Sequence, residues 1–307
     1  MTAIARAALL AAALACLAAP SVAQVKLTPG FTNPKITFWN RKDDGPYWTT
    51  TDGGKPMAAS RTKVRDGMVK RRVLEEYGEF LSPLHLPRTL RIMASDCNGG
   101  DFDSPYYSRT DKAMTVCYSY VGLTEQMADD VTRNTAKVKR WIPTTREQLV
   151  AGEFAATVLH ETGHALFDIL EIPVFGREED GADQVEAYLA LQFGTDIART
   201  IIKADAYFYE WTTTDPKTFA GFSDPHDVDS QRMYNLLCIG YGGQRAAFQD
   251  LVTSGWLPKE RADGCDKEYA QLDRAFQRTV GPYIDQAQMA KVKARKDWFL
   301  AAELKDK

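Results

Sequence analysis

The sequence predicts a helix-rich α+β fold in which a small sheet precedes a long helix. Helical apolar spacing recurs along most of the chain after residue 66, whereas alternating apolar and polar residues occur in two short stretches before residue 121. The 307 residues are 44% hydrophobic and 11% aromatic, which is enough for a substantial core. The sequence has no internal repeat and no low-complexity linker. Its length fits one large domain or two small ones.

Residues 1–23 have the layout of a secretory signal peptide. Arg6 precedes an apolar run over residues 7–19, and a proline and small residues follow that run. The run is shorter than the about 20 residues that a membrane helix needs. We therefore expect cleavage after Ala23, export to the periplasm or the medium, and a mature chain without a membrane span. A lipid anchor on Cys16 is a lesser alternative, because no leucine stands three residues before that cysteine.

Four cysteines remain after this expected cleavage, and an even number in an exported chain favours disulfides. The sequence offers two local pairs, Cys97 with Cys117 and Cys238 with Cys265. Four buried thiols are the alternative. The chain contains no CxxC motif, so a zinc site made of thiolates is not expected.

The N-terminal third predicts loops, one helix and two strands. Residues 24–63 are rich in Pro, Gly, Thr and Asp, which is typical of a peripheral, loop-rich segment, so we expect the main domain to span residues 64–307. Helical spacing covers residues 66–81. Alternation predicts strands over residues 88–97 and 113–120, with a loop between them.

The rest of the chain predicts long helices. Thr144 and Glu147 have the spacing of a capping box, which marks the start of a helix that ends before Pro173. The expected helices span residues 124–140, 144–170, 178–200, 228–253 (with a break at 240–243) and 258–284.

A metal-binding pattern lies in the middle of the helix that begins at Thr144. Residues 158–170 read VLHETGHALFDIL, and His160 and His164 lie on one side of the helix because they are four residues apart. Two imidazoles converging there can hold zinc, and Glu161 can reach a water bound to it, as in the HExxH arrangement. Gly163 indicates close approach by a neighbouring backbone. The alternative is a pair of core histidines satisfied by hydrogen bonds.

A di-iron site, which also uses an ExxH step, is not expected. Such a site needs a second ExxH step from another helix. Neither His85 nor His226 has a glutamate three residues before it.

Catalytic zinc usually takes three protein ligands and a water, so we expect a third ligand on the next helix. Glu179 and Asp183 form an E-x-x-x-D step there. We expect Glu179 to bind the metal and Asp183 to accept a hydrogen bond from the other ring nitrogen of one histidine. Glu178 and Glu186 are alternative ligands. Without a metal, the acids would be a solvated helix start stabilised by the helix dipole.

Hydrolysis also needs a donor to the developing oxyanion, and His226 is the candidate, with Tyr234 behind it. The alternative is a histidine at a helix start that pairs with Asp224 or Asp227. His85, which stands between two leucines, is expected to be structural.

The segment HETGHALFDILEIPVFGREEDGADQVEAYLA resembles the signature of a bacterial putative metallopeptidase family, whose domain is otherwise of unknown function. The resemblance extends more weakly to CYSY upstream and DPHDVDSQRMYNLLCIGYG downstream, over about residues 70–280. The E-x-x-x-D step is also similar to that of the glutamate-zincins, which include the thermolysin-like enzymes.

This resemblance implies a zincin-like metalloprotease fold with zinc held by His160, His164 and a glutamate, and with Glu161 as the base. It also implies that the strand over residues 113–120 can pair with an extended substrate. The interval between His164 and Glu179 is shorter than in the thermolysin-like enzymes, so the third ligand is where this chain departs from their pattern.

Together these features predict an exported zinc-dependent metallopeptidase that hydrolyses peptide bonds through a metal-activated water, with Glu161 as general base. The expected partner is a peptide or protein substrate. The formal net charge of −3, without a basic block, argues against nucleic acid. The alternatives are a non-catalytic exported metal-binding or interaction protein, and a zinc amidase acting on a non-protein amide such as a cell-wall crosspeptide.

Overall fold

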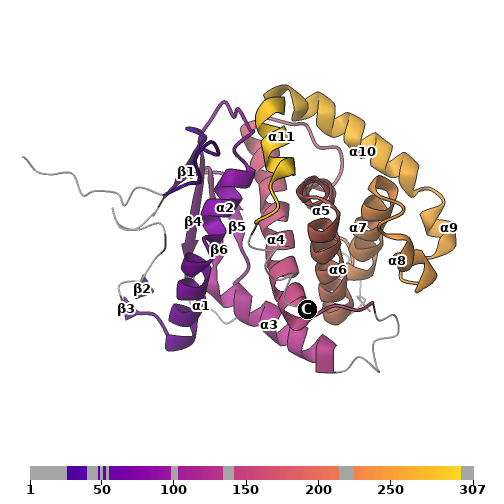
Figure 1. Ribbon diagram of the computed structural model, residues 1–307, viewed down its shortest axis with the longest axis horizontal. Coiled ribbons are helices and arrows are strands. Elements are labelled where there is room, and N and C mark those ends of the chain that lie inside the picture. The colour runs from indigo at the N-terminus through magenta and orange to yellow at the C-terminus, as the bar shows by residue number, and fades with distance from the viewer. Residues whose placement is uncertain are drawn as a thin grey trace, which may run out of the picture.

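The structure is a computed structural model, which describes residues 26–39, 48, 51–52, 55–97, 103–133, 142–213 and 225–298. The expected signal peptide, residues 1–23, lies outside the described residues. Within them a small sheet precedes a set of long helices, which confirms the α+β, helix-rich class (Figure 1). None of the described helices is both long enough and apolar enough to cross a bilayer.

The main sheet has four strands in the order β1-β4-β6-β5. They are β1 (Ile36–Phe38), β4 (Leu90–Ser95), β5 (Tyr106–Ser108) and β6 (Ala113–Cys117). The first three strands in that order are parallel, and β5 pairs antiparallel with β6 at one edge. A separate two-stranded sheet joins β2 (Thr51–Asp52) to β3 (Lys55–Pro56). The N-terminal segment expected to be peripheral thus contributes β1 to the main sheet.

Two expectations about the strands are wrong. The strand expected over residues 113–120 ends at Cys117, and Tyr118 begins helix α3 (Tyr118–Arg133). Part of the expected loop forms β5, which is too short for alternation to reveal it. Because β6 already has a partner on each side, it has no edge for a substrate; β5 is the outer strand instead.

The first helical region is longer than expected and is broken. It consists of α1 (Ala59–Lys70) and α2 (Val73–Phe80), so it begins inside the expected loop segment. Met68 is the one buried residue of α1, which leaves little apolar periodicity to mark its start. The break falls at Arg72, whose backbone is left-handed with φ of 56°.

The central helix is α4 (Arg146–Ile169). The capping box that starts it is one residue later than expected. The Gln148 N–H donates to the Thr145 hydroxyl at 3.2 Å, and the Thr145 N–H donates to the Gln148 side chain at 3.0 Å. Thr144 and Glu147 have the same spacing, so the sequence alone does not separate the two pairs.

The single helix expected over residues 178–200 is two helices, α5 (Glu178–Ala190) and α6 (Thr195–Thr212), with the 3-10 turn η1 (Leu191–Phe193) between them. Gly194 separates them with φ of 93°, which a side chain would disfavour. The remaining elements are α7 (Asp229–Gly243), α8 (Gln249–Thr253), α9 (Lys259–Ala262), α10 (Cys265–Thr279), the 3-10 turn η3 (Gly281–Tyr283) and α11 (Gln286–Ala294).

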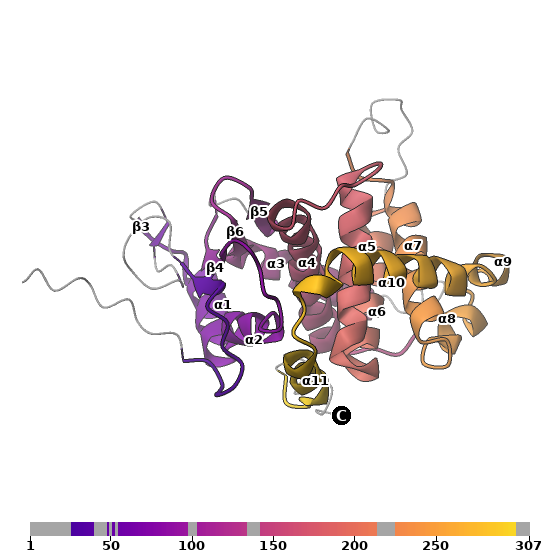
Figure 2. The ribbon, with the colours of Figure 1, turned by 90° about the horizontal axis from the view of Figure 1, so that it is seen from above.

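Helix α4 lies between the sheet on one side and α5, α6 and α7 on the other (Figures 1 and 2). Two glycines allow its neighbours to approach closely. A Cβ added at Gly163 would lie 2.9 Å from the Ala182 Cα of α5, and one at Gly152 would lie 2.6 Å from the Thr200 carbonyl oxygen of α6. The close approach expected at Gly163 is confirmed, and it places α5 directly against the histidine-bearing turn.

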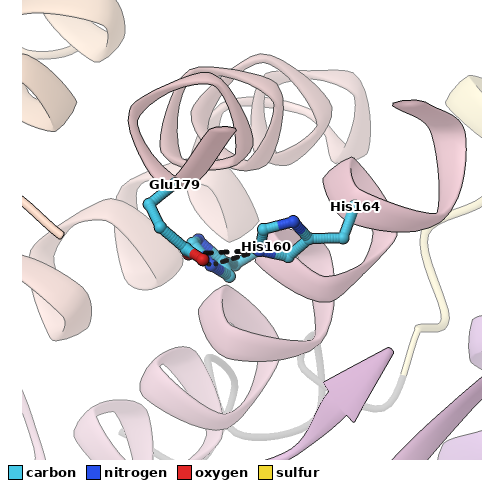
Figure 3. Close-up of side chains that lie close together, drawn as sticks. All are labelled: His160, His164 and Glu179. Atoms are coloured by element: carbon cyan, nitrogen blue, oxygen red, sulfur yellow. Dashed lines mark hydrogen bonds and ion pairs between the residues drawn. The ribbon is translucent and has the colours of Figure 1, made fainter. Parts of the chain in front are cut away.

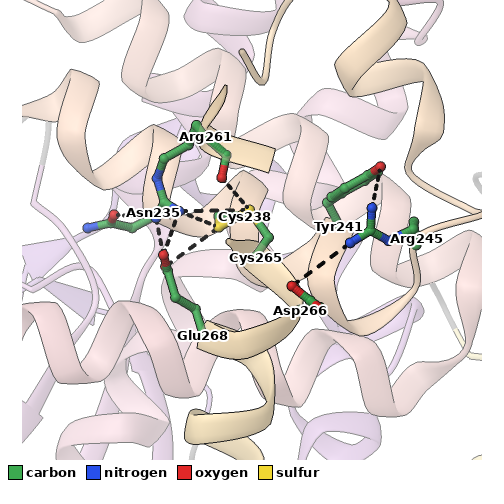
Figure 4. The surroundings of a disulfide bond; sticks show 8 residues. All are labelled: Asn235, Cys238, Tyr241, Arg245, Arg261, Cys265, Asp266 and Glu268. Atoms are coloured by element: carbon green, nitrogen blue, oxygen red, sulfur yellow. Dashed lines mark hydrogen bonds and ion pairs between the residues drawn. A yellow bond between two sulfur atoms is a disulfide. The ribbon is translucent and has the colours of Figure 1, made fainter. Parts of the chain in front are cut away.

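Both expected disulfides are present. Cys97–Cys117 joins the C-terminal ends of the parallel strands β4 and β6, and Cys238–Cys265 joins α7 to the first residue of α10. Beside the second disulfide, Arg261 donates to both carboxylate oxygens of Glu268 at 2.7 Å (Figure 4). The first disulfide thus crosslinks two neighbouring strands of the sheet, and the second crosslinks two neighbouring helices.

Candidate metal centre

Three side chains from two helices meet at one point in the structure. His160 and His164 on α4 direct their rings toward Glu179 in the first turn of α5 (Figure 3). The two Nε2 atoms are 3.2 Å apart, and Glu179 Oε2 lies 3.1 Å from the His160 Nε2 and 3.2 Å from the His164 Nε2. The three atoms therefore form a nearly equilateral triangle.

This triangle fits a zinc ion. A tetrahedral zinc with bonds of about 2.0–2.1 Å to nitrogen and oxygen requires ligand atoms about 3.3–3.4 Å apart. The distances of 3.1 and 3.2 Å in this triangle are close to that requirement. Two imidazoles and one carboxylate are also the ligand types that zinc takes in catalytic sites, with the fourth position left for water. The three residues thus have the types and spacing needed to hold zinc.

Each histidine has a second carboxylate on its other ring nitrogen. His160 Nδ1 is 2.8 Å from Asp183 Oδ1, and His164 Nδ1 is 2.7 Å from Glu178 Oε1. Such contacts fix the ring orientation and leave each Nε2 facing Glu179. The structure therefore has the contact expected between Asp183 and the other ring nitrogen of one histidine. Glu178 contacts the far side of a ring, so the geometry favours Glu179 over it as the third ligand.

Two arginines hold these outer carboxylates. Arg232 of α7 donates to both oxygens of Asp183, at 2.7 and 2.8 Å. Arg109, just after β5, pairs with Glu178. Neither arginine was expected from the sequence, since each contact joins residues far apart along the chain and no local motif marks it.

The electrostatics of the site favour charged histidines when no metal is bound. Burial lowers the pKa of His160, but the hydrogen bonds that its ring donates to Asp183 and Glu179 raise it to about 10. The pKa of His164 is also raised, by Glu179 and Glu178 acting against burial. Hydrogen bonds from His160, His164 and His226 hold the pKa of Glu179 far below its usual value. Glu179 is thus an anion on which three imidazole rings converge.

Glu161 lies next to this cluster and has a different environment. Its Oε2 accepts a hydrogen bond of 2.8 Å from the Tyr107 N–H of β5. Burial raises the pKa of its carboxyl. A carboxylate with a raised pKa, oriented by one backbone donor, is suited to accept a proton. Tyr107 was expected to lie in a loop.

His226 also reaches the cluster, since its Nε2 is 3.1 Å from Glu179 Oε2. Among the described residues, the groups of side chains whose spacing suits a metal do not include His226. Its side chain is 41% exposed. Asp227, one of its alternative partners, pairs with Arg177, and Asp224 lies outside the described residues. His85 is exposed and lies away from this cluster, with its Nε2 3.8 Å from the Asp285 Oδ2.

Glu186, the other alternative ligand, is buried one turn beyond Asp183. It belongs to a second cluster, with His160 and Asp183, whose ligand atoms also lie close together. Glu153 of α4 and Asp205 of α6 line the same cavity as Glu186. No sequence pattern singles out these two acids, because each is an isolated acid in a helical segment.

Comparison with protein families gives a match over most of the chain. Residues 54–280 match the model of a protein family described as "Putative metallopeptidase". No curated protein and no solved structure matches the chain. The matched region contains the two helices that carry the ligand triangle and the helix that carries Arg232.

Proposed function

This chain belongs to the family described as "Putative metallopeptidase", and on that premise we propose that it is a zinc-dependent peptidase. The observation that carries the proposal is the ligand triangle of His160, His164 and Glu179, with Glu161 beside it. A structural metal site would need the three ligands, but it would have no use for an adjacent carboxylate whose pKa is raised by burial.

The proposed mechanism assigns one task to each side chain. His160, His164 and Glu179 would hold the zinc, which when bound polarises the substrate carbonyl and lowers the pKa of its water to about 7. Glu161 would accept a proton from the attacking water and deliver it to the leaving nitrogen. The Tyr107 N–H keeps the Glu161 carboxylate in place. His226, with a half-exposed ring beside Glu179, would give up its contact with Glu179 to donate to the developing oxyanion.

We further propose that β5 presents its outer edge, beside the N–H of Tyr107 that Glu161 accepts, to an extended substrate. It is the outer strand of the sheet, and Tyr107 in its middle already contacts Glu161. Addition of a strand to a sheet edge is a common way to hold a peptide. Export through the N-terminal signal, to the periplasm or the medium, remains part of this proposal.

The test is a Glu161→Gln variant beside a Glu147→Gln control, which changes an exposed glutamate of the same helix. We expect Glu161→Gln to keep its zinc and to lose peptide hydrolysis by about 10²–10⁴-fold. Elemental analysis and cleavage of a broad peptide library measure the two effects. Undiminished hydrolysis by zinc-loaded Glu161→Gln would refute the base role. A zinc-loaded wild type that cleaves no peptide would favour the binding protein or the amidase.

A further inference from the structure

A cavity of about 160 Å³ adjoins the metal centre. His160 and Glu161 line it, and so do three acids from three different helices: Glu153 of α4, Glu186 of α5 and Asp205 of α6. We call this cavity the acidic pocket. The proposed catalytic mechanism uses none of the three acids.

The three acids are buried and incompletely satisfied. Their residues are 1%, 2% and 4% exposed, for Glu153, Glu186 and Asp205 respectively. One oxygen of each carboxyl is buried and receives no hydrogen bond from any donor in the described part of the chain. Buried carboxylates are costly unless they are paired, so three in one cavity require an explanation.

Protons can satisfy the acids only in part. Asp205 lies within hydrogen-bonding reach of both Glu153 and Glu186, and burial raises the pKa of all three carboxyls. Tyr120 donates to Glu153 Oε1 at 2.6 Å. These contacts still leave one buried oxygen of each acid without a partner, and a cation in the pocket would meet these oxygens.

No basic side chain among the described residues donates a hydrogen bond to these acids, although the charge of Arg232 lowers the pKa of Glu153 and of Asp205 through space. Arg232 lines the pocket, but its guanidinium is bound to both oxygens of Asp183 and stacks over Tyr209 at 4.7 Å from the ring centroid. Asp183 in turn is shared with His160. The guanidinium that lines the pocket is thus hydrogen-bonded to a different carboxylate, and one buried oxygen of each of the three acids is left for a ligand.

The walls and size of the pocket indicate which cation it takes. Phe208 and Tyr209 line it beside the acids, so it offers apolar surface as well as charge. A cavity of about 150 Å³ accommodates benzene, with its six heavy atoms. The five heavy atoms of a lysine side chain fit a similar volume, with the methylenes against the aromatic rings and the ammonium among the carboxyls.

We propose that the acidic pocket binds the cationic side chain, lysine in the first place, of a residue next to the peptide bond that the metal centre cleaves. The peptide context rests on the proposed function; the affinity for a cationic side chain does not. A second metal ion, for which His160, Asp183 and Glu186 also have suitable spacing, is the competing occupant. It would leave most of the cavity and its aromatic walls unused.

Direct binding tests the pocket without requiring catalysis. Zinc-loaded wild-type protein is titrated calorimetrically with N-acetyl-lysine methylamide and with its neutral norleucine counterpart. Because leaving a buried charge unpaired costs at least about 2 kcal/mol, we expect the lysine probe to bind about thirtyfold tighter or more. Equal binding of the two probes by wild type would overturn the proposal, and this comparison needs no variant.

Variants locate the effect. Asp205→Asn and Glu153→Gln should each reduce the preference for the lysine probe by about tenfold or more. Glu260→Gln, which removes an exposed charge, should leave it unchanged. Elemental analysis accompanies each titration. A second metal equivalent in wild type that disappears in Asp205→Asn would also overturn the proposal, because the pocket would then be a metal site.

Cleavage separates the pocket from the proposed function. Peptides with lysine or norleucine beside the scissile bond should differ in kcat/KM by a similar factor, in favour of lysine. A protein that binds the lysine probe but hydrolyses no peptide supports the pocket and refutes the peptidase. A protein that hydrolyses both peptides equally and binds both probes equally supports the peptidase and refutes the pocket.

Discussion

Both histidine rings of the centre have a carboxylate on each nitrogen. His160 lies between Asp183 and Glu179, and His164 lies between Glu178 and Glu179. In the absence of a metal, each ring can donate in both directions, and the carboxylates favour its charged form. A metal requires the free lone pair of Nε2, so metal binding and deprotonation are coupled.

Zinc binding should therefore release protons at neutral pH. The pKa of His160 is raised to about 10, so at pH 7 its metal-free ring is charged and must lose a proton when zinc binds. We expect at least about one proton released per zinc, and an apparent affinity that rises about tenfold per pH unit for each proton released. Calorimetry in buffers of different ionisation enthalpy measures this release. Zinc binding with no proton release and no dependence on pH would contradict the assigned hydrogen bonds.

The local part of the site was predictable from the sequence, and the rest was not. His160, Glu161 and His164 share one helical turn, so their spacing alone fixes their geometry. For the third ligand, the sequence left Glu178, Glu179 and Glu186 open, since helix rotation decides which of them faces the rings. Tyr107 contacts Glu161, 54 residues further along the chain, and Arg232 contacts Asp183, 49 residues before it. No local sequence pattern encodes such contacts.

At the scale of elements, the packing of α5 against α4 brings Glu179 to His160 and His164. Gly163 contacts Ala182, which lies between Glu179 and Asp183 along α5. The absence of a side chain at Gly163 lets α5 come close enough for both acids to reach His160.

Gly163→Ala should therefore weaken zinc binding although alanine favours helices by about 1 kcal/mol. The added methyl would lie 2.9 Å from the Ala182 Cα, so α5 must move away and carry Glu179 with it. We expect the zinc affinity to fall about tenfold or more, with a lower melting temperature. Gly67→Ala is the matched control, because its Cβ would meet nothing within 4 Å and should stabilise α1. Full zinc affinity in Gly163→Ala would show that the close approach is not needed.

The type of most elements followed from periodicity, whereas several boundaries did not. The apolar stripe of residues 178–200 continues through Gly194, so a single helix was expected, yet the positive φ there starts a new helix. Likewise, Tyr118 is as buried as the β6 residues before it, which hides the change from strand to helix. Burial on all sides removes the periodicity on which such predictions depend.

At the scale of the whole molecule, Glu79 joins both ends of the described chain. Its fully buried carboxylate on α2 accepts hydrogen bonds from the Thr28 N–H, from Arg72 at 2.8 Å and from Arg295 just after α11. Thr28 and Arg295 lie near the two ends of the described residues. The N-terminal segment, the α2 region and the C-terminal segment are thus held at one ionised group.

Glu79→Gln should destabilise the protein in a manner that depends on pH. Burial raises the pKa of Glu79, but the bonds from Thr28, Arg295 and Arg72 outweigh it and lower the pKa below its ordinary value. Stability from a lowered pKa is fully present above the unfolded pKa of about 4.3 and is lost as pH falls through the folded pKa. We expect a loss of about 3 kcal/mol at pH 7, which shrinks below about pH 4.

Urea unfolding at several pH values measures this difference. Glu171→Gln is the control, because its ion pair with Arg88 is exposed and should contribute little at any pH. A loss of equal size at pH 3 and pH 7 for Glu79→Gln would argue against the ionised cluster.

The metal content of purified protein tests the central claim most directly, for wild type, Glu179→Ala and Glu178→Ala, determined by elemental analysis. If zinc is held by the two imidazoles and Glu179, wild type carries one zinc per chain and Glu179→Ala loses nearly all of it. Glu178→Ala, which removes a hydrogen-bond partner of His164 rather than a ligand, keeps its zinc with about 10–100-fold weaker affinity. A wild type that takes up no zinc, or a Glu179→Ala variant that retains a full equivalent of zinc, would contradict the claim that these three residues hold the metal.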